Sequence, residues 1–390
     1  MRSHSLLRVY NDPMLSARFH HRLDDINAVC WDALAGTGHP FVRHAFLAGL
    51  ERCGCIRAAW GWQPHHLTLH DGERLVAAAP VYLKGNSHGE FVFDWGWAHA
   101  WERAGGAYYP KLLLGVPYSP IAGPRLLVAD GPSAPMLRRA LVDAIAGETR
   151  RLGLSSAHAN FLRASELDAF DMPWLAREDT QYHWQNRGYR DFDDFLATLR
   201  HKKRKNIRHE RQQVKAAGVD CTMLGGTRMH DEHWQTVHAL YQATFDEKGN
   251  HAALSLDFFR HLGTTLGDDV QVALASRDGN ILAMALFLRG ADTLYGRYWG
   301  ACEEIAGLHF ELCYYQGIEY AIAQGLERFE PGAQGVHKIA RGFLPVATHS
   351  RHFIVDDGFR AAVARSLAAE TREVHRHRRE LMTHSPYAQP

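Results

Sequence analysis

A pattern that occurs twice along the chain constrains the fold more than any other feature of the sequence. Residues 66–83 read as a strand of alternating polarity, an Asp71-Gly72 turn and an apolar return strand. Residues 270–288 repeat this order around Asp278-Gly279, about 200 residues later. Asp-Gly between two such runs favours a two-residue β-hairpin. The repeat indicates that the chain contains two related halves.

The segments that follow the two hairpins also match in order. A helix is expected at 136–151, followed by a short strand that ends near Asn160-Phe161. The second half has a helical pattern at 309–324 and then a short strand at 328–330. Each half therefore reads as hairpin, strand, helix and strand, which predicts an α/β (α+β) fold with a helix packed on a mixed sheet.

The length of 390 residues suits two domains of ordinary size. The repeat places an N-terminal domain at 1–190, which carries an insertion at 86–133. A basic linker helix follows at 191–218. The second domain is expected at 219–356, and a C-terminal helix and tail at 357–390.

The composition excludes several classes of protein. The net charge of +1 argues against general polyanion binding, so any attraction for phosphates must come from local patches. The first 15 residues lack the apolar core of a secretory signal, and no apolar run is long enough to span a membrane. The six cysteines lack the paired spacing of zinc sites. A cytoplasmic protein with reduced thiols, no metal site and no bound cofactor is expected.

The segment 200–215 concentrates positive charge. It contains eight Lys or Arg and one Glu, which gives a local charge of +7, and it should be helical because it lacks Pro and Gly. One interpretation is an anion site for a tRNA backbone, a nucleotide diphosphate or CoA phosphates; the other is a solvated helix. The candidate donor-phosphate ligands are Lys203, Arg204, Lys205 and Arg208.

The insertion at 86–133 is rich in glycine, proline and aromatic residues, which predicts a rigid irregular loop. Such a loop would present Lys111, Tyr118 and Arg125. As a substrate-recognition loop it would use the two cations to contact a phosphate or carboxylate. As a structural lid it would pack its aromatic side chains on the sheet.

Residues 329–343 bring imidazole, cationic and carboxylate groups together on a glycine-rich loop after the last strand of the repeat. His337 is a candidate general base, with Lys338 and Arg341 as stabilisers of a developing oxyanion. Glu330 at the strand end is a further candidate acid or base. The alternative is a glycine-rich turn that happens to contain basic residues.

The strand at 295–300 carries a third group of candidates. Alternation places Tyr295, Arg297 and Trp299 on one face and Tyr298 on the other. The first three side chains could line an acceptor or acyl-chain pocket, or simply pack a buried strand.

With these segments in view, the chain resembles the FemAB-like (peptidoglycan biosynthesis/recognition) family of the GNAT acyltransferase superfamily. The resemblance extends from about residue 15 to 375. The matching motifs are VPYSP at 116–120, GPR at 123–125, KKRKNIRHER at 202–211, YWG at 298–300, CYYQGI at 313–318, FEPGAQG at 329–335, and ARGFLP at 340–345. The resemblance implies two tandem GNAT-like domains. It also implies transfer of an amino acid from aminoacyl-tRNA to an amine.

The leading hypothesis is an N-acyltransferase that joins an activated acyl or aminoacyl donor, such as aminoacyl-tRNA, to a primary amine on a small molecule or peptide. Two alternatives stay open. One is an acyl-CoA-dependent N-acyltransferase of a small metabolite, and the other is a GNAT pair that binds peptidoglycan or RNA without catalysis. The acyl-CoA signature of ordinary GNAT enzymes is not clearly present.

Overall fold

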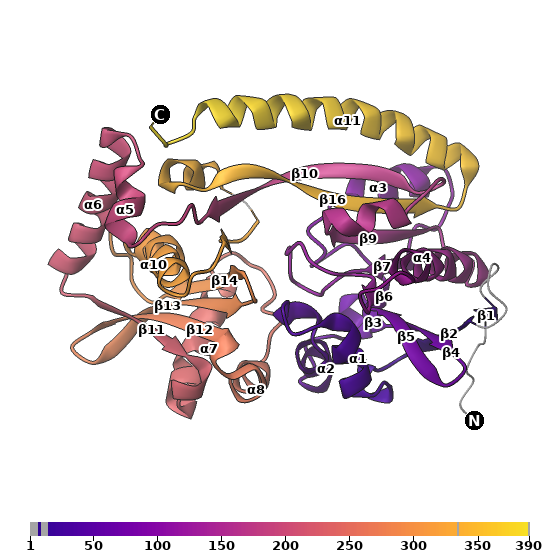
Figure 1. Cartoon of the computed structure of the whole chain (residues 1–390), viewed down its shortest axis with the longest axis horizontal. Helices are drawn as coiled ribbons and strands as arrows, with labels where there is room; N and C mark the ends of the chain where they lie inside the picture. The colour runs from indigo at the N-terminus through magenta and orange to yellow at the C-terminus, as the bar shows by residue number, and fades with distance from the viewer. Residues whose placement is uncertain (1–6, 9–14, 334, 389–390) are drawn as a thin grey trace. The chain divides into compact units, whose positions relative to one another are not determined.

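The computed structural model describes residues 7–8, 15–333 and 335–388 (Figure 1). Most of the first 15 residues, in which no secretory signal was expected, lie outside these residues, as does Gln334 of the glycine-rich loop. No helix in the described part of the chain is both long and apolar enough to cross a membrane.

The chain forms two compact units, each assembled from separate segments of the sequence. Unit 1 comprises Met1–Asp179 with Ala347–His375, and unit 2 comprises Thr180–Val346 with Arg376–Pro390. This division differs from the predicted linear one. Three elements run through both units: β10 (Leu175–Gln185), β16 (Leu344–Ile354) and α11 (Asp357–Thr383).

Unit 1 contains two groups of paired strands. One has the order β1-β2-β4-β5-β8, and the other runs β16-β9-β7-β6-β3. Its strands are β1 (Leu7–Arg8), β2 (Leu15–His20), β3 (Trp62–Pro64), β4 (His66–Asp71), β5 (Arg74–Ala79), β6 (Val81–Lys84), β7 (Lys111–Leu114), β8 (Leu127–Val128) and β9 (Ser156–Leu162). Its helices are α1 (Ala28–Ala35), α2 (His44–Arg52), α3 (Trp95–Arg103) and α4 (Ala134–Arg151).

The predicted hairpin of unit 1 forms, but its return strand is divided. β4 pairs with β5 in antiparallel register, whereas β6 pairs with β3 and β7 in the other group of strands. The division falls at Pro80, which has no backbone N–H and cannot continue a ladder on both sides. The single apolar strand expected up to residue 83 was therefore wrong.

The insertion at 86–133 is also more regular than expected. It contains α3, β7 and β8, and all four residues of β7 are buried. β7 pairs with β6 on one side and β9 on the other, so the run Lys111–Leu114 is a central strand rather than part of an irregular loop.

Helix α4 supplies one side of the unit 1 core. Leu141 and Ile145 are 0% exposed and lie four residues apart on the buried face. On the same helix the fully buried Glu148 accepts hydrogen bonds from Arg151 and His65, the latter at 2.7 Å. Burial alone would raise the pKa of Glu148, but these partners outweigh it and lower the pKa from 4.5 to about 2.

Unit 1 is therefore expected to lose stability in acid through Glu148. A carboxyl whose pKa is lower in the folded state stabilises the fold above its unfolded pKa, and this contribution disappears as the pH falls from 4.5 towards 2. Thermal melts across this window should show a shallower pH dependence for Glu148→Gln than for the wild type. Glu73→Gln, at a highly exposed carboxylate, should leave the slope unchanged. Equal slopes for all three proteins would contradict the assignment.

The sheet of unit 2 has the order β11-β12-β13-β14-β15, with β10 at its end. Its further strands are β11 (Asp220–Gly225), β12 (Val270–Arg277), β13 (Asn280–Arg289), β14 (Thr293–Ala301) and β15 (Arg328–Glu330). Its helices are α5 (Phe192–Ala197), α6 (His201–Ala216), α7 (Asp231–Asp246), α8 (Leu256–Leu266), α9 (Leu308–Phe310) and α10 (Gln316–Ala323).

The second predicted hairpin is confirmed. β12 and β13 pair in antiparallel register around Asp278 and Gly279, whose φ angles are 52° and 79°. Positive φ at both central residues defines the type I′ turn that Asp-Gly favours. The hairpin fixes which side chains of the two strands face each side of the sheet.

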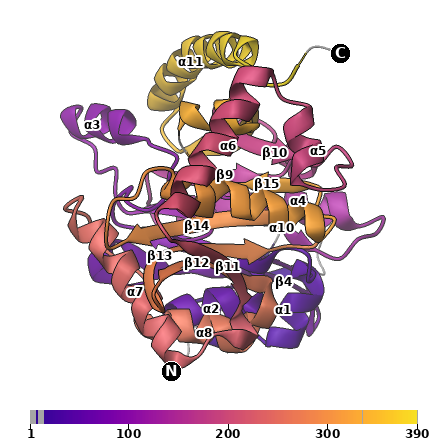
Figure 2. The ribbon, with the colours of Figure 1, turned by 90° about the vertical axis from the view of Figure 1, so that its left-hand side faces the viewer.

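Helices cover both faces of this sheet (Figure 2). The small residues Ala273 and Ala285 belong to a buried cluster with α10 and the turn before it. On the opposite face α7 approaches β14 so closely that a Cβ on Gly300 would lie 2.3 Å from the carbonyl oxygen of Leu240. The predicted helix-on-mixed-sheet arrangement is confirmed here.

Two predicted helices of unit 2 are interrupted. The helix expected at 309–324 consists of α9, a π-helical turn (Glu311–Tyr315) and α10. The basic helix is preceded by the separate α5, and α6 packs through Ile207 and Val214, which lie seven residues apart. π-helical turns are frequent at functional sites.

Candidate active site

A cavity of about 270 Å³ opens where two parallel strands of unit 2 part. β14 and β15 pair only from Thr293 with Arg328 to Tyr295 with Glu330. β15 stops before Pro331, which lacks a backbone donor, whereas β14 continues to Ala301. The space between these two segments is lined by residues of β14, the π-helical turn and the glycine-rich segment after β15.

Two of the predicted catalytic residues line this cavity. Nε2 of His337 lies 2.9 Å from the hydroxyl of Tyr314, which the π-helical turn contributes to the same cavity. Burial and the nearby charges of Arg341 and Lys338 lower the pKa of His337. The imidazole is therefore neutral at pH 7 and can accept a proton.

Lys338 is a buried cation in the same wall. The residue is 3% exposed, and its Nζ donates a hydrogen bond to the carbonyl oxygen of Gly332 at 2.8 Å. None of the lining residues that the structure describes is Asp or Glu. Burial without a carboxylate partner lowers the pKa of Lys338 to about 8, so its ammonium is mostly charged at neutral pH and can meet a negative charge in the cavity.

His309 is a lining residue to which sequence reasoning assigned no role. Its ring lies 5.2 Å from that of Trp299 and 6.4 Å from that of His337. Burial is the main cause that lowers the pKa of His309 to about 4, and electrostatic repulsion from His337 is the second. The only sequence signal was its place at the start of the helical pattern. A similar limit applies to Tyr314, whose orientation depends on the π-helical turn.

Arg341, predicted to stabilise an oxyanion, is not among the residues that line the cavity. It is 8% exposed, and its donors reach Glu210 at 2.6 Å, the Tyr315 hydroxyl at 3.0 Å and the carbonyl oxygen of His337 at 3.0 Å. Its guanidinium also stacks 3.4 Å from the ring centroid of Phe310. Arg341 is thus committed to protein groups and holds the backbone of His337.

The other candidates in unit 2 divide between the cavity and the interior. Arg297 and Trp299 line the cavity, and so does Tyr298, which the alternation had placed on the other face of the strand. Tyr295 is 4% exposed and is not among the lining residues. Glu330 is 7% exposed at the end of β15, and a carboxylate oxygen lies 3.7 Å from Nδ1 of His183.

The three candidates on the insertion belong to the interior of unit 1. Lys111 and Arg125 are 0% exposed, and the guanidinium of Arg125 donates to three backbone carbonyl oxygens. The hydroxyl of Tyr118 donates to the carbonyl oxygen of Cys55 at 3.0 Å. The prediction that a loop presents these two cations to a substrate is therefore wrong, because buried protein partners use them.

The predicted phosphate ligands lie on the accessible part of α6. Lys205 and Arg208 are exposed, and Lys203 and Arg204 are half-buried. Arg208 pairs with Asp193 at 2.9 Å, and Arg204 donates to a backbone carbonyl of α5. None of the four is among the residues that line the cavity between β14 and β15 or the larger cavity beside it, so their role as donor ligands stays a prediction.

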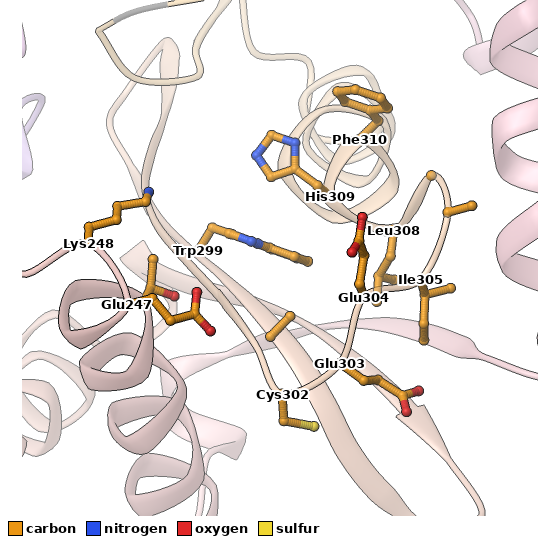
Figure 3. Close-up of a pocket in the computed structure, with 14 residues that line it drawn as sticks. Glu247, Lys248, Trp299, Cys302, Glu303, Glu304, Ile305, Leu308, His309 and Phe310 are labelled. Atoms are coloured by element: carbon orange, nitrogen blue, oxygen red, sulfur yellow. The ribbon is translucent and has the colours of Figure 1, made fainter.

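A second cavity of about 570 Å³ adjoins the first and shares Trp299 and His309 with it. Figure 3 shows Glu247 and Lys248 at the end of α7 facing the loop that carries Glu303 and Glu304. In the part of the chain that the structure describes, no group of three His, Cys, Asp or Glu residues is placed to hold a metal ion.

Comparisons with known proteins relate the whole chain to one family. The family model described as FemAB-like, peptidoglycan biosynthesis/recognition, matches residues 22–389. No curated protein matches the sequence. The crystal structure of FemX aligns with a TM-score of 0.52 at 11% identity, covering 87% of this chain and 98% of that chain.

A second solved structure gives a similar result. The C-terminal domain of a putative lysylphosphatidylglycerol synthetase from Agrobacterium fabrum aligns with a TM-score of 0.50 at 14% identity. The alignment covers 87% of this chain and 94% of that chain. At these identities the likeness is one of fold, and the predicted α/β architecture with mixed sheets is confirmed.

Proposed function

Because the chain belongs to the FemAB-like family of peptidoglycan biosynthesis and recognition proteins and shares its fold with FemX, we propose that it is an N-acyltransferase of the GNAT type. It joins an activated acyl or aminoacyl group to a primary amine. The observation that carries the proposal is the cavity between β14 and the segment after β15. There a neutral imidazole, a tyrosine hydroxyl and a buried ammonium line one space.

His337 and Tyr314 supply the base. An amine attacks a carbonyl only as a neutral molecule, so a proton must leave it. The tyrosine oxygen takes this proton while its own proton passes to Nε2 of His337, 2.9 Å away. His337 is suited to this step because its lowered pKa keeps the imidazole unprotonated at pH 7.

Lys338 supplies the charge that stabilises the tetrahedral intermediate. As the amine nitrogen bonds to the acyl carbon, the carbonyl oxygen becomes negative. The buried ammonium interacts with that oxygen more strongly than it would in water. The bond between the acyl carbon and the oxygen or sulfur of the donor then breaks, and the leaving group takes the proton that His337 received, which returns through Tyr314. Arg341 contributes by positioning His337, and Glu330 stays outside the cavity lining.

The donor's phosphates are assigned to the exposed side of α6. Lys205 and Arg208 lie there with the half-buried Lys203 and Arg204. A basic helical face of this kind suits a nucleic-acid backbone, which favours aminoacyl-tRNA as donor. An acyl-CoA donor remains the second arm of the test.

The proposal is tested by mass spectrometry of amide products formed from aminoacyl-tRNA and acyl-CoA pools with a set of amines. A new amide is expected with the wild type. His337→Ala should reduce its rate of formation by about 100-fold, since removal of a general base commonly costs this much. His377→Ala, an exposed histidine on α11, should leave the rate unchanged.

Two results would remove the assignment. Unchanged turnover in both His337→Ala and Tyr314→Phe would mean that the base lies elsewhere. Specific, saturable binding of a peptidoglycan fragment or RNA without any product from either donor pool would favour a recognition protein instead.

A further inference from the structure

The single acidic residue of the basic helix has an unexpected partner. Glu210 is the only Asp or Glu in α6. Its Oε1 accepts a hydrogen bond from Arg341 at 2.6 Å, although the two residues are 131 positions apart in the sequence. The side chains are only 20% and 10% exposed, so this ion pair is screened by solvent far less than the surface pairs of the molecule.

Arg341 in turn contacts the segment that carries His337, the proposed base. One of its nitrogens donates to the carbonyl oxygen of His337 at 3.0 Å, and its guanidinium stacks on Phe310. His337 lies only four residues before Arg341 in a short 3-10 helix (Val336–Arg341). The position of the imidazole therefore depends on where the guanidinium is held.

The middle of α6 also contacts the π-helical turn that carries Tyr314. The hydroxyl of Tyr315 donates to Oε2 of Glu210, and Tyr315 follows the cavity residue Tyr314 in the π-helical turn. The next residue of the helix, Arg211, pairs with Glu311 at the start of that turn at 3.0 Å. Gly307, with φ of 84°, lets the loop approach closely, because a Cβ there would lie 2.7 Å from the Glu210 carbonyl oxygen.

We infer that Glu210 is a positioning residue that sets the relative placement of His337 and Tyr314. It contacts Arg341, which holds the His337 backbone, and Tyr315, which follows Tyr314. The inference rests on the proposed function for its catalytic consequence and on the contacts of α6 for its geometry. On this inference, α6 both positions the catalytic pair and carries the predicted phosphate ligands.

The physical reason is the burial of Arg341. Among the described residues, Glu210 is the one carboxylate within ion-pair distance of Arg341. Without it the guanidinium would be a buried charge without a counter-charge, and its movement towards water would release the His337 carbonyl. Displacement of a catalytic group by a fraction of an ångström lowers the rate of the chemical step more than the affinity for substrate.

The test compares Glu210→Ala and Glu210→Gln with Glu232→Ala, an exposed glutamate on α7. Kinetics are measured at a temperature at which far-UV circular dichroism shows every variant folded. Glu210→Ala should lower kcat about tenfold and leave KM for the donor within about twofold. Glu210→Gln keeps an acceptor for Arg341 but not its counter-charge and should recover part of kcat, while Glu232→Ala should match the wild type.

A second readout does not depend on turnover. In protein labelled with 13C-histidine, the ring signals of His337 should shift or broaden in Glu210→Ala, whereas those of His377 should not. Unchanged His337 signals and unchanged kcat, in a protein that His337→Ala inactivates, would overturn the positioning role and leave the proposed function intact. Shifted signals in a protein that His337→Ala leaves active would support the positioning role and overturn the catalytic one.

Discussion

Replacing Lys111 with methionine is expected to lower the free energy of unfolding by about 4 kcal/mol, because it removes one partner of a buried ion-pair network. Nζ of Lys111 donates to Ser87 at 2.8 Å, Glu90 at 3.0 Å and Asp94 at 2.5 Å. Lys111, Glu90 and Asp94 are all buried. The variant would leave two buried carboxylates without the lysine that forms an ion pair with both of them.

The loss should grow as the pH rises. In the wild type, burial alone would raise the pKa of Asp94, but Lys111 outweighs it and holds that pKa below its usual range. Burial raises the pKa of Glu90 to about 7 despite Lys111. Without the lysine both carboxyls would have raised pKa values, so the folded variant would have to lose protons at neutral pH, and its stability would fall from pH 4 to pH 8.

Chemical denaturation at both pH values measures this effect. Lys84→Met is the matched control, since Lys84 is equally buried but donates to a backbone carbonyl and stacks on Trp62. Its loss should be smaller, about 1 kcal/mol. The combination of Lys111→Met with Glu90→Gln and Asp94→Asn should recover part of the lost stability. Equal losses for the two lysine variants would mean that the carboxylates are not the cause.

Replacing Arg341 with methionine is expected to destabilise the protein by about 3 kcal/mol and to reduce turnover as well. The variant would leave the Glu210 carboxylate and the His337 carbonyl oxygen without their donor. The partial exposure of Glu210 keeps the cost below that of the Lys111 variant. Denaturant unfolding and steady-state kinetics should both change.

The control for this variant is Arg190→Met. Arg190 forms an exposed pair with Asp194 at 3.5 Å, and such pairs contribute little to stability. No measurable change in unfolding is expected. Combining Arg341→Met with Glu210→Gln should recover stability, because the leftover carboxylate is then neutral. A double variant as unstable as the sum of the single ones would show that the two residues are not coupled.

Local patterns in the sequence were sufficient for most elements of unit 2. The Asp278-Gly279 turn, the strands around it and the short strand at 328–330 lie where the periodicity placed them. The glycine-rich segment after that strand was recognised as a candidate site, and the structure places His337 and Lys338 of this segment in one cavity. These features depend on neighbouring residues, which is why they could be predicted.

The errors arose where distant parts of the chain decide the outcome. Lys111 and Arg125 are cationic residues of the type that usually lies at the surface and binds ligands. Pairing of β7 with β9 and packing of the insertion bury them. Pro80 interrupts a run that otherwise has the pattern of one strand. The position of the Tyr314 hydroxyl in the cavity depends on a π-helical turn for which the sequence offers no signal.

The sequence by itself determined the duplicated α/β architecture, the basic helix and the glycine-rich segment proposed to carry the base, because turns, periodicity and charge clustering are encoded within short stretches. Only the tertiary structure decided which charges face a cavity and which are used internally. Arg341 looked like a catalytic cation, yet its partner is Glu210 on a helix far away in the sequence. A buried charge requires a counter-charge, and the fold alone determines where that counter-charge lies.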